Sequence, residues 1–186
     1  MLREACSTVA GWRADGLVDE AFGLAVNISA RQLDRPDIAD EVLAAVTGAG
    51  LDPNTVWLEV TETALIADRD RAVAALAALR RAGIRVSIDD FGTGYGSLGL
   101  LQQLPVDALK VDRSFVERLL DDPGAETITA TILSLASAFG LEVVAEGIER
   151  PEQHERLRAM GCTLGQGYLF SRPLVADELR SRILEA

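Results

Sequence analysis

Short apolar runs that end in a polar residue recur along the chain, 20 to 36 residues apart. Most of the gaps between them hold one amphipathic helical pattern, such as residues 69–81, and Gly83 follows that pattern where a helix C-cap is expected. This alternation of short strands and helices predicts a parallel α/β fold. The runs occupy residues 24–26, 56–58, 85–88, 108–109, 142–145 and 164–165, and the polar residues that end them are Asn27, Glu59, Asp89 with Asp90, Lys110, Glu146 and Gln166.

The polar residues that end the runs are candidate functional residues. In a parallel barrel the C-terminal ends of the strands lie on one face, where such folds place their chemistry. Apart from Lys110, these side chains offer oxygen ligands without histidine or cysteine, a set that suits Mg²⁺ or Mn²⁺ better than Zn²⁺. Taken alone, Asp89 and Asp90 are better explained as a turn cap and a solvent-exposed side chain. The whole series of polar positions favours a metal site instead.

Length and composition set limits on the fold and on the ligand. A chain of 186 residues with 48% hydrophobic content can bury one core, so we predict a single domain over residues 1–186. The net charge of −11 argues against a surface that tracks a long nucleic acid. A small phosphate ester remains a suitable ligand if divalent cations supply the missing positive charge.

The apolar stretches and the cysteines bear on the cellular location of the chain. Threonine and serine interrupt the longest apolar stretch, residues 128–141, and the first residues lack the pattern of a secretory leader. We therefore expect no membrane segment. Cys6 and Cys162 lie far apart in the sequence without metal-ligand spacing, which predicts buried, inert thiols in a reduced, cytoplasmic setting.

Lys110 is the only lysine, because the other 17 basic residues are arginine. A compact ammonium whose pKa responds to burial can hold or activate a water near phosphate, which a guanidinium does less well. His154 lies at the polar start of a helical pattern, so we predict a solvated surface residue. That prediction sets aside a Ser/His/Asp triad.

A glycine-rich stretch follows the two aspartates, and two glutamates follow other candidate ligands. Residues 92–96 lack the dinucleotide fingerprint and the P-loop lysine, so a mobile loop over the site is favoured, with a structural turn as the alternative. Glu62 and Glu149 each stand three residues beyond a candidate ligand, where they would orient ligands or pin the loop, or else be exposed carboxylates. The loop residues nearest the site are Phe91, Gly92, Thr93 and Gly94.

Six segments in order resemble motifs of the EAL domain family, the cyclic di-GMP phosphodiesterases. The resemblance implies a TIM-type (β/α)₈ barrel, here incomplete with about six parallel strands and intervening helices. It also implies hydrolysis of cyclic di-GMP to linear pGpG with two Mg²⁺ or Mn²⁺ ions. The matching segments are residues 26–32, 58–62, 89–95, 109–112, 145–149 and 166–168.

The resemblance assigns roles by matching position. Asp89 would bridge two metal ions, one held also by Asn27 and Glu59 and the other also by Asp90 and Glu146. The resemblance implies that Lys110 would hold the attacking water or help deprotonate it, and that Gln166 would support water or metal. It also implies that Glu62 would anchor the 89–97 loop and that Glu149 would act from outside the set of ligands.

The Glu-Ala-Leu signature of the family should precede Asn27 by more residues than the chain has, and it is absent. Residues 1–16 resemble the helix after the signature strand, so we expect the first two barrel strands to be missing. We favour a truncated phosphodiesterase whose own turnover is weak or absent. The alternative is a non-catalytic module that binds cyclic di-GMP or another protein. Members of the family commonly pair near the 89–97 loop, which leaves a homodimer open.

Overall fold

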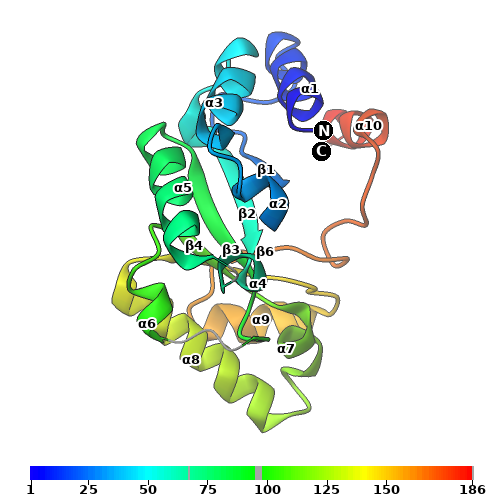
Figure 1. Cartoon of the computed structure of the whole chain (residues 1–186). Helices are drawn as coiled ribbons and strands as arrows, with labels where there is room; N and C mark the ends of the chain where they lie inside the picture. The colour runs from blue at the N-terminus through cyan, green and yellow to red at the C-terminus, as the bar shows by residue number, and fades with distance from the viewer. Residues whose placement is uncertain (67, 95–97, 186) are drawn as a thin grey trace.

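The computed structural model describes residues 1–66, 68–94 and 98–185. In that part of the chain, six strands form one sheet in sequence order, and every neighbouring pair is parallel. All six carboxyl ends therefore lie along one edge, which confirms the predicted six-stranded α/β half-barrel (Figure 1). The strands are β1 Leu24–Asn27, β2 Val56–Thr61, β3 Arg85–Phe91, β4 Ala108–Val111, β5 Glu142–Ala145 and β6 Leu164–Gly165.

Helices connect the strands and cover the outer face of the sheet (Figure 1). The helices of the described residues are α1 Leu2–Ala14, α2 Ala30–Leu33, α3 Ile38–Gly48, the 3-10 turn η1 Pro53–Thr55, α4 Glu62–Ile66, α5 Arg69–Arg81, α6 Leu98–Leu101, α7 Arg113–Arg118, α8 Pro123–Phe139, α9 Pro151–Ala159 and α10 Ala176–Leu184.

Helix α5 shows how the sequence encodes these connections. Asp68 caps its start by accepting a hydrogen bond from the backbone N–H of Arg71 at 3.3 Å. Leu76 and Leu79 on one side of the helix are buried. After the helix, Gly83 adopts φ +86°, a left-handed conformation that favours glycine. The predicted helix over residues 69–81 is confirmed.

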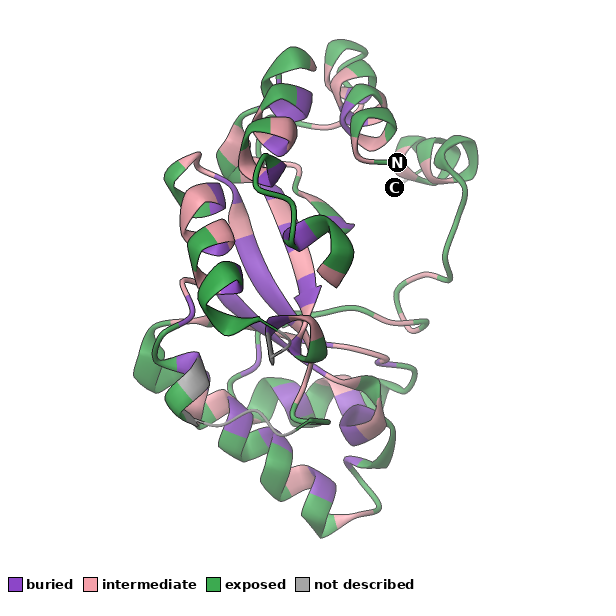
Figure 2. Cartoon of the chain, viewed as in Figure 1, coloured by how far each residue is buried: buried purple, intermediate pink, exposed green. Residues whose placement is uncertain are grey.

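The two faces of the sheet have different surroundings (Figure 2). Along β2, Val56, Leu58 and Val60 are buried against the helices, while the alternate residues are only half-buried. On the inner face, the Arg85 guanidinium stacks on the Trp57 ring at 3.8 Å and pairs with Glu142 at 2.9 Å. The inner face of the half-barrel is therefore lined by polar as well as apolar groups.

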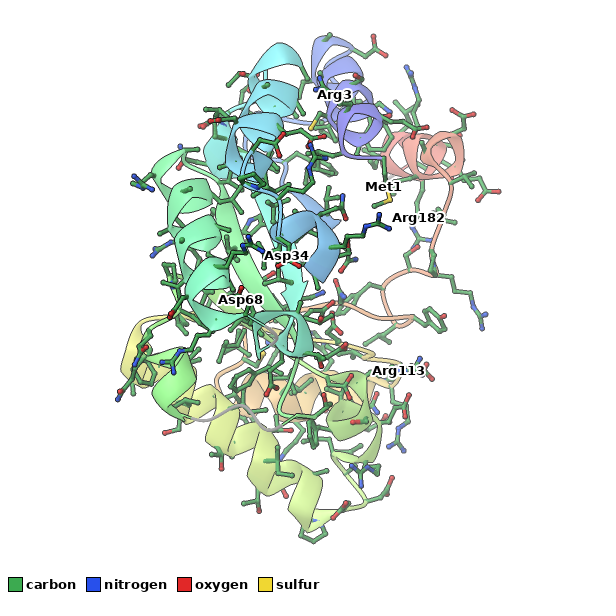
Figure 3. The ribbon with its side chains drawn as sticks, viewed as in Figure 1. Met1, Arg3, Asp34, Asp68, Arg113 and Arg182 are labelled. Carbon is green, nitrogen blue, oxygen red and sulfur yellow. The ribbon has the colours of Figure 1, made fainter. Side chains whose placement is uncertain are left out.

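The last helix packs beside the first (Figures 1 and 3). Arg180 on α10 pairs with Asp15, which follows α1, at 2.8 Å. Arg182, labelled in Figure 3, donates a hydrogen bond to the carbonyl of Phe170 at 2.9 Å. The Arg180–Asp15 pair holds α10 beside the end of α1, and both ends of the chain lie close together.

Three further predictions can be compared with the structure. Cys6 and Cys162 are both buried and unbridged, as expected, and burial raises the pKa of each thiol. Within residues 1–66, 68–94 and 98–185, no helix has the length and apolar character needed to cross a membrane. The prediction for His154 is wrong, because its half-buried ring packs edge-on against Phe170, with 5.5 Å between centroids.

Candidate active site

Lys110 lies at the centre of a group of carboxylates contributed by β2, β3 and the residue that follows β5. Its side chain enters from β4 and is buried, with 3% of the residue exposed. The Nζ atom lies 2.5 Å from an oxygen of Glu146, 2.7 Å from one of Glu59 and 3.1 Å from one of Asp89. One ammonium therefore faces three carboxylates, and the group as a whole has an excess of negative charge.

The charge imbalance is visible in the direction of the pKa shifts. Burial by itself lowers the pKa of Lys110, but hydrogen bonds and attraction from Glu146 and Glu59 outweigh it, so the pKa is raised. Burial raises the pKa of Glu146, and the charges of Asp89 and Glu59 add to that effect, although Lys110 opposes it. Lys110 is therefore held as an ammonium, while the carboxylates around it are only partly compensated.

Asp89, Asp90 and Glu146 form the group of side chains best placed to hold a divalent cation. Each offers one carboxylate oxygen, and these oxygens all lie within 4.8 Å of one another. Burial and the neighbouring charges of Asp89 and Asp112 raise the pKa of Asp90. Crowded carboxylates of this kind gain most from a cation between them, so the donor set fits Mg²⁺ or Mn²⁺.

The backbone of β3 directs its two aspartates differently. The register between β3 and β4 shifts between Ile88 and Phe91. At this irregularity Asp90 has φ +56°, and its N–H donates to Asp89 Oδ1 at 3.1 Å. Aspartate tolerates the left-handed conformation better than most residues because its short side chain can bond locally. The kink lets both carboxylates reach the same edge of the sheet.

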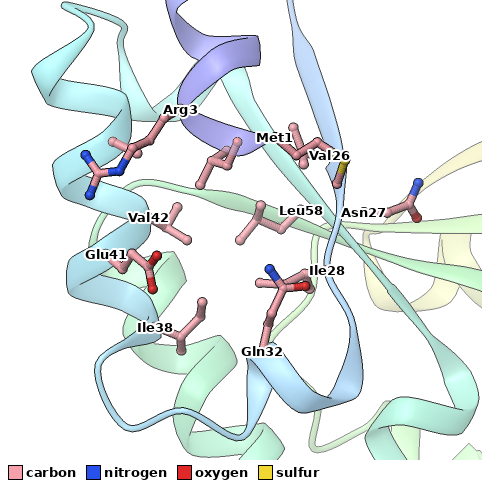
Figure 4. A pocket seen from close by; sticks show the side chains of 12 residues that line it. Met1, Arg3, Val26, Asn27, Ile28, Gln32, Ile38, Glu41, Val42 and Leu58 are labelled. Atoms are coloured by element: carbon pink, nitrogen blue, oxygen red, sulfur yellow. The ribbon is translucent and has the colours of Figure 1, made fainter.

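Two amide side chains lie at opposite ends of this group. Gln166 follows β6 and donates to Glu146 Oε1 at 2.7 Å. Asn27 ends β1 and pairs in register with Glu59. Figure 4 shows that the side chain of Asn27 points away from Val26 and Ile28, beside a pocket between α1, α3 and β1 that Arg3, Gln32 and Glu41 line together with apolar residues. Asn27 thus lies on the inner face with the candidate ligands, although it also borders that pocket.

Asp112 is a residue of this site that the pattern of strand ends did not single out. Its carboxylate lies beside Asp90 and raises the pKa of Asp90 through its charge and a side-chain hydrogen bond. Its Oδ1 also accepts a hydrogen bond from the N–H of Ser114 at 3.0 Å, which caps α7. The signal was its position two residues after Lys110, since alternate residues of a strand face the same side.

The loop after β3 is held by Glu62, which is buried with 3% exposed. Its Oε2 accepts a hydrogen bond from the N–H of Gly92 at 3.3 Å. A side chain at position 94 would place its Cβ 2.9 Å from Glu62 Oε1, so the close approach requires Gly94. Thr93 donates its hydroxyl to the carbonyl of Asp90 at 2.9 Å. The predicted loop residues Tyr95, Gly96 and Ser97 lie outside the described residues.

A cavity of about 420 Å³ opens beside Glu146 and Gln166. Arg172 lies over the ring of Tyr168 at 5.0 Å, and both residues line this cavity. Glu149 lines it as well, next to the candidate ligands, and Arg113, labelled in Figure 3, contributes a second guanidinium. Glu117 lines the cavity too, so the wall beside the carboxylate cluster carries charges of both signs and an aromatic ring.

Similar proteins include named phosphodiesterases and solved structures. The chain is 46% identical over 177 residues to cyclic di-GMP phosphodiesterase NbdA from Pseudomonas aeruginosa, covering 94% of this chain and 22% of NbdA. The EAL domain of Mycobacterium smegmatis DcpA is 40% identical with a TM-score of 0.92, covering 99% of this chain and 82% of that one. A manganese and cyclic di-GMP complex of Klebsiella pneumoniae BlrP1 is 37% identical with a TM-score of 0.80, covering 90% and 42%.

The matches cover most of this chain but only part of each curated relative. The chain spans less than a third of the length of the curated relatives it matches. A model of the family described as the EAL domain matches residues 1–173, which is most of the chain. That match, the parallel half-barrel and the likeness to solved EAL domains agree. The chain belongs to the EAL domain family.

Proposed function

We propose that this chain hydrolyses cyclic di-GMP to linear pGpG in the presence of a divalent cation. The observation that carries the proposal is the burial of Lys110 among Glu59, Asp89 and Glu146, beside a cluster of carboxylates able to hold a cation. Membership of the EAL family and the names of the relatives support this substrate. In this proposal the enzyme is bacterial and cytoplasmic, and its substrate is a soluble second messenger.

The acidic residues hold the cations in this proposal. Asp89, Asp90 and Glu146 would hold one Mg²⁺ or Mn²⁺, and Asn27, Glu59 and Asp89 would hold the other. Bound cations make water nucleophilic at neutral pH and offset charge on the phosphate during in-line displacement. In the overall reaction, a water oxygen bonds to phosphorus, the P–O3′ bond breaks, and the released 3′ oxygen takes up a proton.

The remaining site residues orient water and substrate. Lys110 lies among the carboxylates that would hold the cations, so its proposed role is to hold the attacking water or to help deprotonate it. Gln166 fixes the orientation of Glu146 through the 2.7 Å hydrogen bond. Glu62 anchors the loop after β3, and Glu149 supports the site from the wall of the cavity.

The cavity beside Glu146 receives the dinucleotide. The Tyr168 ring offers a face on which a guanine base can stack, and Arg113 and Arg172 offer donors for phosphate oxygens. These residues supply positive charge to a chain whose net charge is −11. Cyclic di-GMP therefore finds both an aromatic surface and compensating charge next to the carboxylate cluster.

The proposal is tested by incubating the purified chain with cyclic di-GMP and Mn²⁺ and separating pGpG by chromatography. The EAL domain of DcpA serves as the comparison, and circular dichroism checks that the chain is folded. We expect pGpG that disappears with a chelator, formed more slowly than by the comparison domain. A folded chain that forms no pGpG contradicts the proposal. If that chain still binds cyclic di-GMP in equilibrium dialysis, the binding module expected as the alternative is supported.

A further inference from the structure

Gln153 is a buried polar side chain whose amide caps the start of its own helix and also bonds to a neighbouring helix. It lies on α9 with 2% of the residue exposed. Its Oε1 accepts hydrogen bonds from the N–H groups of Glu149 and Arg150, both at 2.9 Å. Its Nε2 donates to the carbonyl of Val116 on α7 at 3.0 Å. One side chain thus joins the end of the segment after β5 to the helix after β4.

The two segments that Gln153 joins carry the catalytic pair. Lys110 lies on β4, which α7 follows, and Glu146 begins the segment that ends at Arg150. The contact between the segments after β4 and β5 is called the seam here. Nearer the site, the N–H of Glu146 holds it by donating to the carbonyl of Val111 at 3.1 Å. The Gln153 amide secures the far end of the seam, where no strand pairing continues.

Close backbone packing fills the seam between these two ends. Gly147 has φ +70°, and a Cβ at this position would approach Cβ of Arg113 to 2.5 Å. The segments after β4 and β5 therefore touch through their backbones, and the seam has no room for a longer side chain. A small separation of the segments would move Glu146 away from Lys110, because each residue is fixed to its own segment.

We propose that Gln153 is a positioning residue that sets the distance between Glu146 and Lys110 by tying together the segments after β4 and β5. The effect of Gln153 on catalysis rests on the proposed function, whereas its effect on the geometry around Lys110 does not. Loss of the amide removes the acceptor of two part-buried N–H groups and leaves the Val116 carbonyl with only the N–H of Leu119 at 3.2 Å, and such losses are costly unless the backbone moves to compensate.

The test uses the single lysine of the chain as a probe of the site. Protein labelled uniformly with ¹⁵N gives one lysine ammonium signal, from Nζ of Lys110, as well as the backbone amide signals, all recorded by NMR without metal at one fixed pH. Gln153→Met removes all three hydrogen bonds at similar volume, whereas Gln153→Glu keeps an acceptor for the two N–H groups and loses the donor to Val116. Thr129→Val is the control, since Thr129 is buried in α8 and bonds only to Ala125 of its own helix.

We expect Gln153→Met to shift the Lys110 signal and to speed amide exchange at Glu149 and Arg150 by about tenfold. Gln153→Glu should retain slow exchange at those amides yet still shift the Lys110 signal, because the tie to α7 is lost. Thr129→Val should lower the melting temperature and leave the Lys110 signal unchanged. An unchanged Lys110 signal in the folded Gln153 variants overturns the proposal and leaves Gln153 a structural cap.

Turnover gives a second measurement where the parent chain hydrolyses cyclic di-GMP. Gln153→Met should then lower kcat about tenfold with a smaller change in KM, because the reacting groups are displaced while Tyr168 and Arg172 of the cavity lie outside the two joined segments. A rise in KM alone overturns the positioning role. Absence of hydrolysis in the parent chain instead contradicts the proposed function, and the Lys110 signal still decides the role of Gln153.

Discussion

Lys110 and Glu146 are in direct contact, with 2.5 Å between Nζ and Oε1, although α7 and α8 separate them along the chain. The contact exists because β4 and β5 are neighbouring parallel strands, with Lys110 paired in register with Val144. Glu146 stands just past the end of β5 and turns toward the same edge of the sheet. This relationship ties the central ammonium to the carboxylate that also belongs to the candidate cation cluster.

Removal of the ammonium should destabilise the metal-free protein and slow the reaction. Lys110→Met leaves the surrounding carboxylates without their shared cation, so we expect the free energy of unfolding to fall by about 3 kcal/mol. Arg118→Met breaks an exposed pair with Asp122 and an exposed hydrogen bond to the carbonyl of Ser114, and should cost less than about 1 kcal/mol. Urea unfolding without metal measures both. Equal losses would show that the Lys110 ion pairs contribute no more than surface ones.

Asp90→Asn should improve metal-free stability and weaken cation binding. The substitution removes a charge that repels Asp89 and Asp112, and asparagine tolerates the left-handed backbone at this position. We expect a higher melting temperature without metal and an Mn²⁺ affinity at least about tenfold lower by calorimetry. Asp121→Asn, at an exposed carboxylate on the surface, should leave Mn²⁺ affinity unchanged. A retained affinity in Asp90→Asn would remove Asp90 from the cation site.

Gly94→Ala should impair turnover more than stability. The added Cβ would meet Glu62 Oε1 at 2.9 Å, so Glu62 must shift and its hydrogen bond to the N–H of Gly92 should weaken. We expect kcat to fall about tenfold, with less than about 1 kcal/mol lost in unfolding free energy. Gly11→Ala in α1 meets no atom within 4 Å and should gain about 0.5–1 kcal/mol without affecting kcat. Full activity in Gly94→Ala would contradict the anchoring role of Glu62.

Arg172→Ala should weaken substrate binding without changing the chemical step. The guanidinium lines the cavity with Tyr168 and is not among the residues that contact Lys110. We expect KM for cyclic di-GMP to rise about tenfold while kcat stays within a factor of two or so. Arg158→Ala on α9 is the matched control, since Arg158 is exposed and does not line this cavity. A fall in kcat at constant KM would assign Arg172 to catalysis instead.

The sequence was sufficient to predict the strands and the edge of the sheet at which their polar end residues lie. The apolar runs correspond to β1 to β6, and residues 69–81 form α5 as the helical period indicated. Parallel strands place their carboxyl ends along one edge, so polar residues at those ends were expected to meet. Glu59, Asp89, Lys110 and Glu146 do meet in the structure.

The contacts of individual side chains were decided by the tertiary structure. Three examples are the side-chain pairing of Asp112 with Asp90, the bond from Gln153 to Val116, and the packing of His154 on Phe170. Each of these contacts joins segments that are distant in the sequence or bent relative to each other. The periodic pattern of apolar and polar residues does not indicate how far apart such segments lie. The raised pKa of Lys110 likewise depends on how many carboxylates reach it.

What the sequence by itself determined is therefore the alternation of elements and the side of each strand that a residue faces, because both follow from local backbone geometry. What only the tertiary structure decided is which of those residues touch, since strand register, the kink at Asp90 and helix packing set distances between separate segments. Chemistry at this site depends on separations of a few ångströms, and those arise only when the segments pack together.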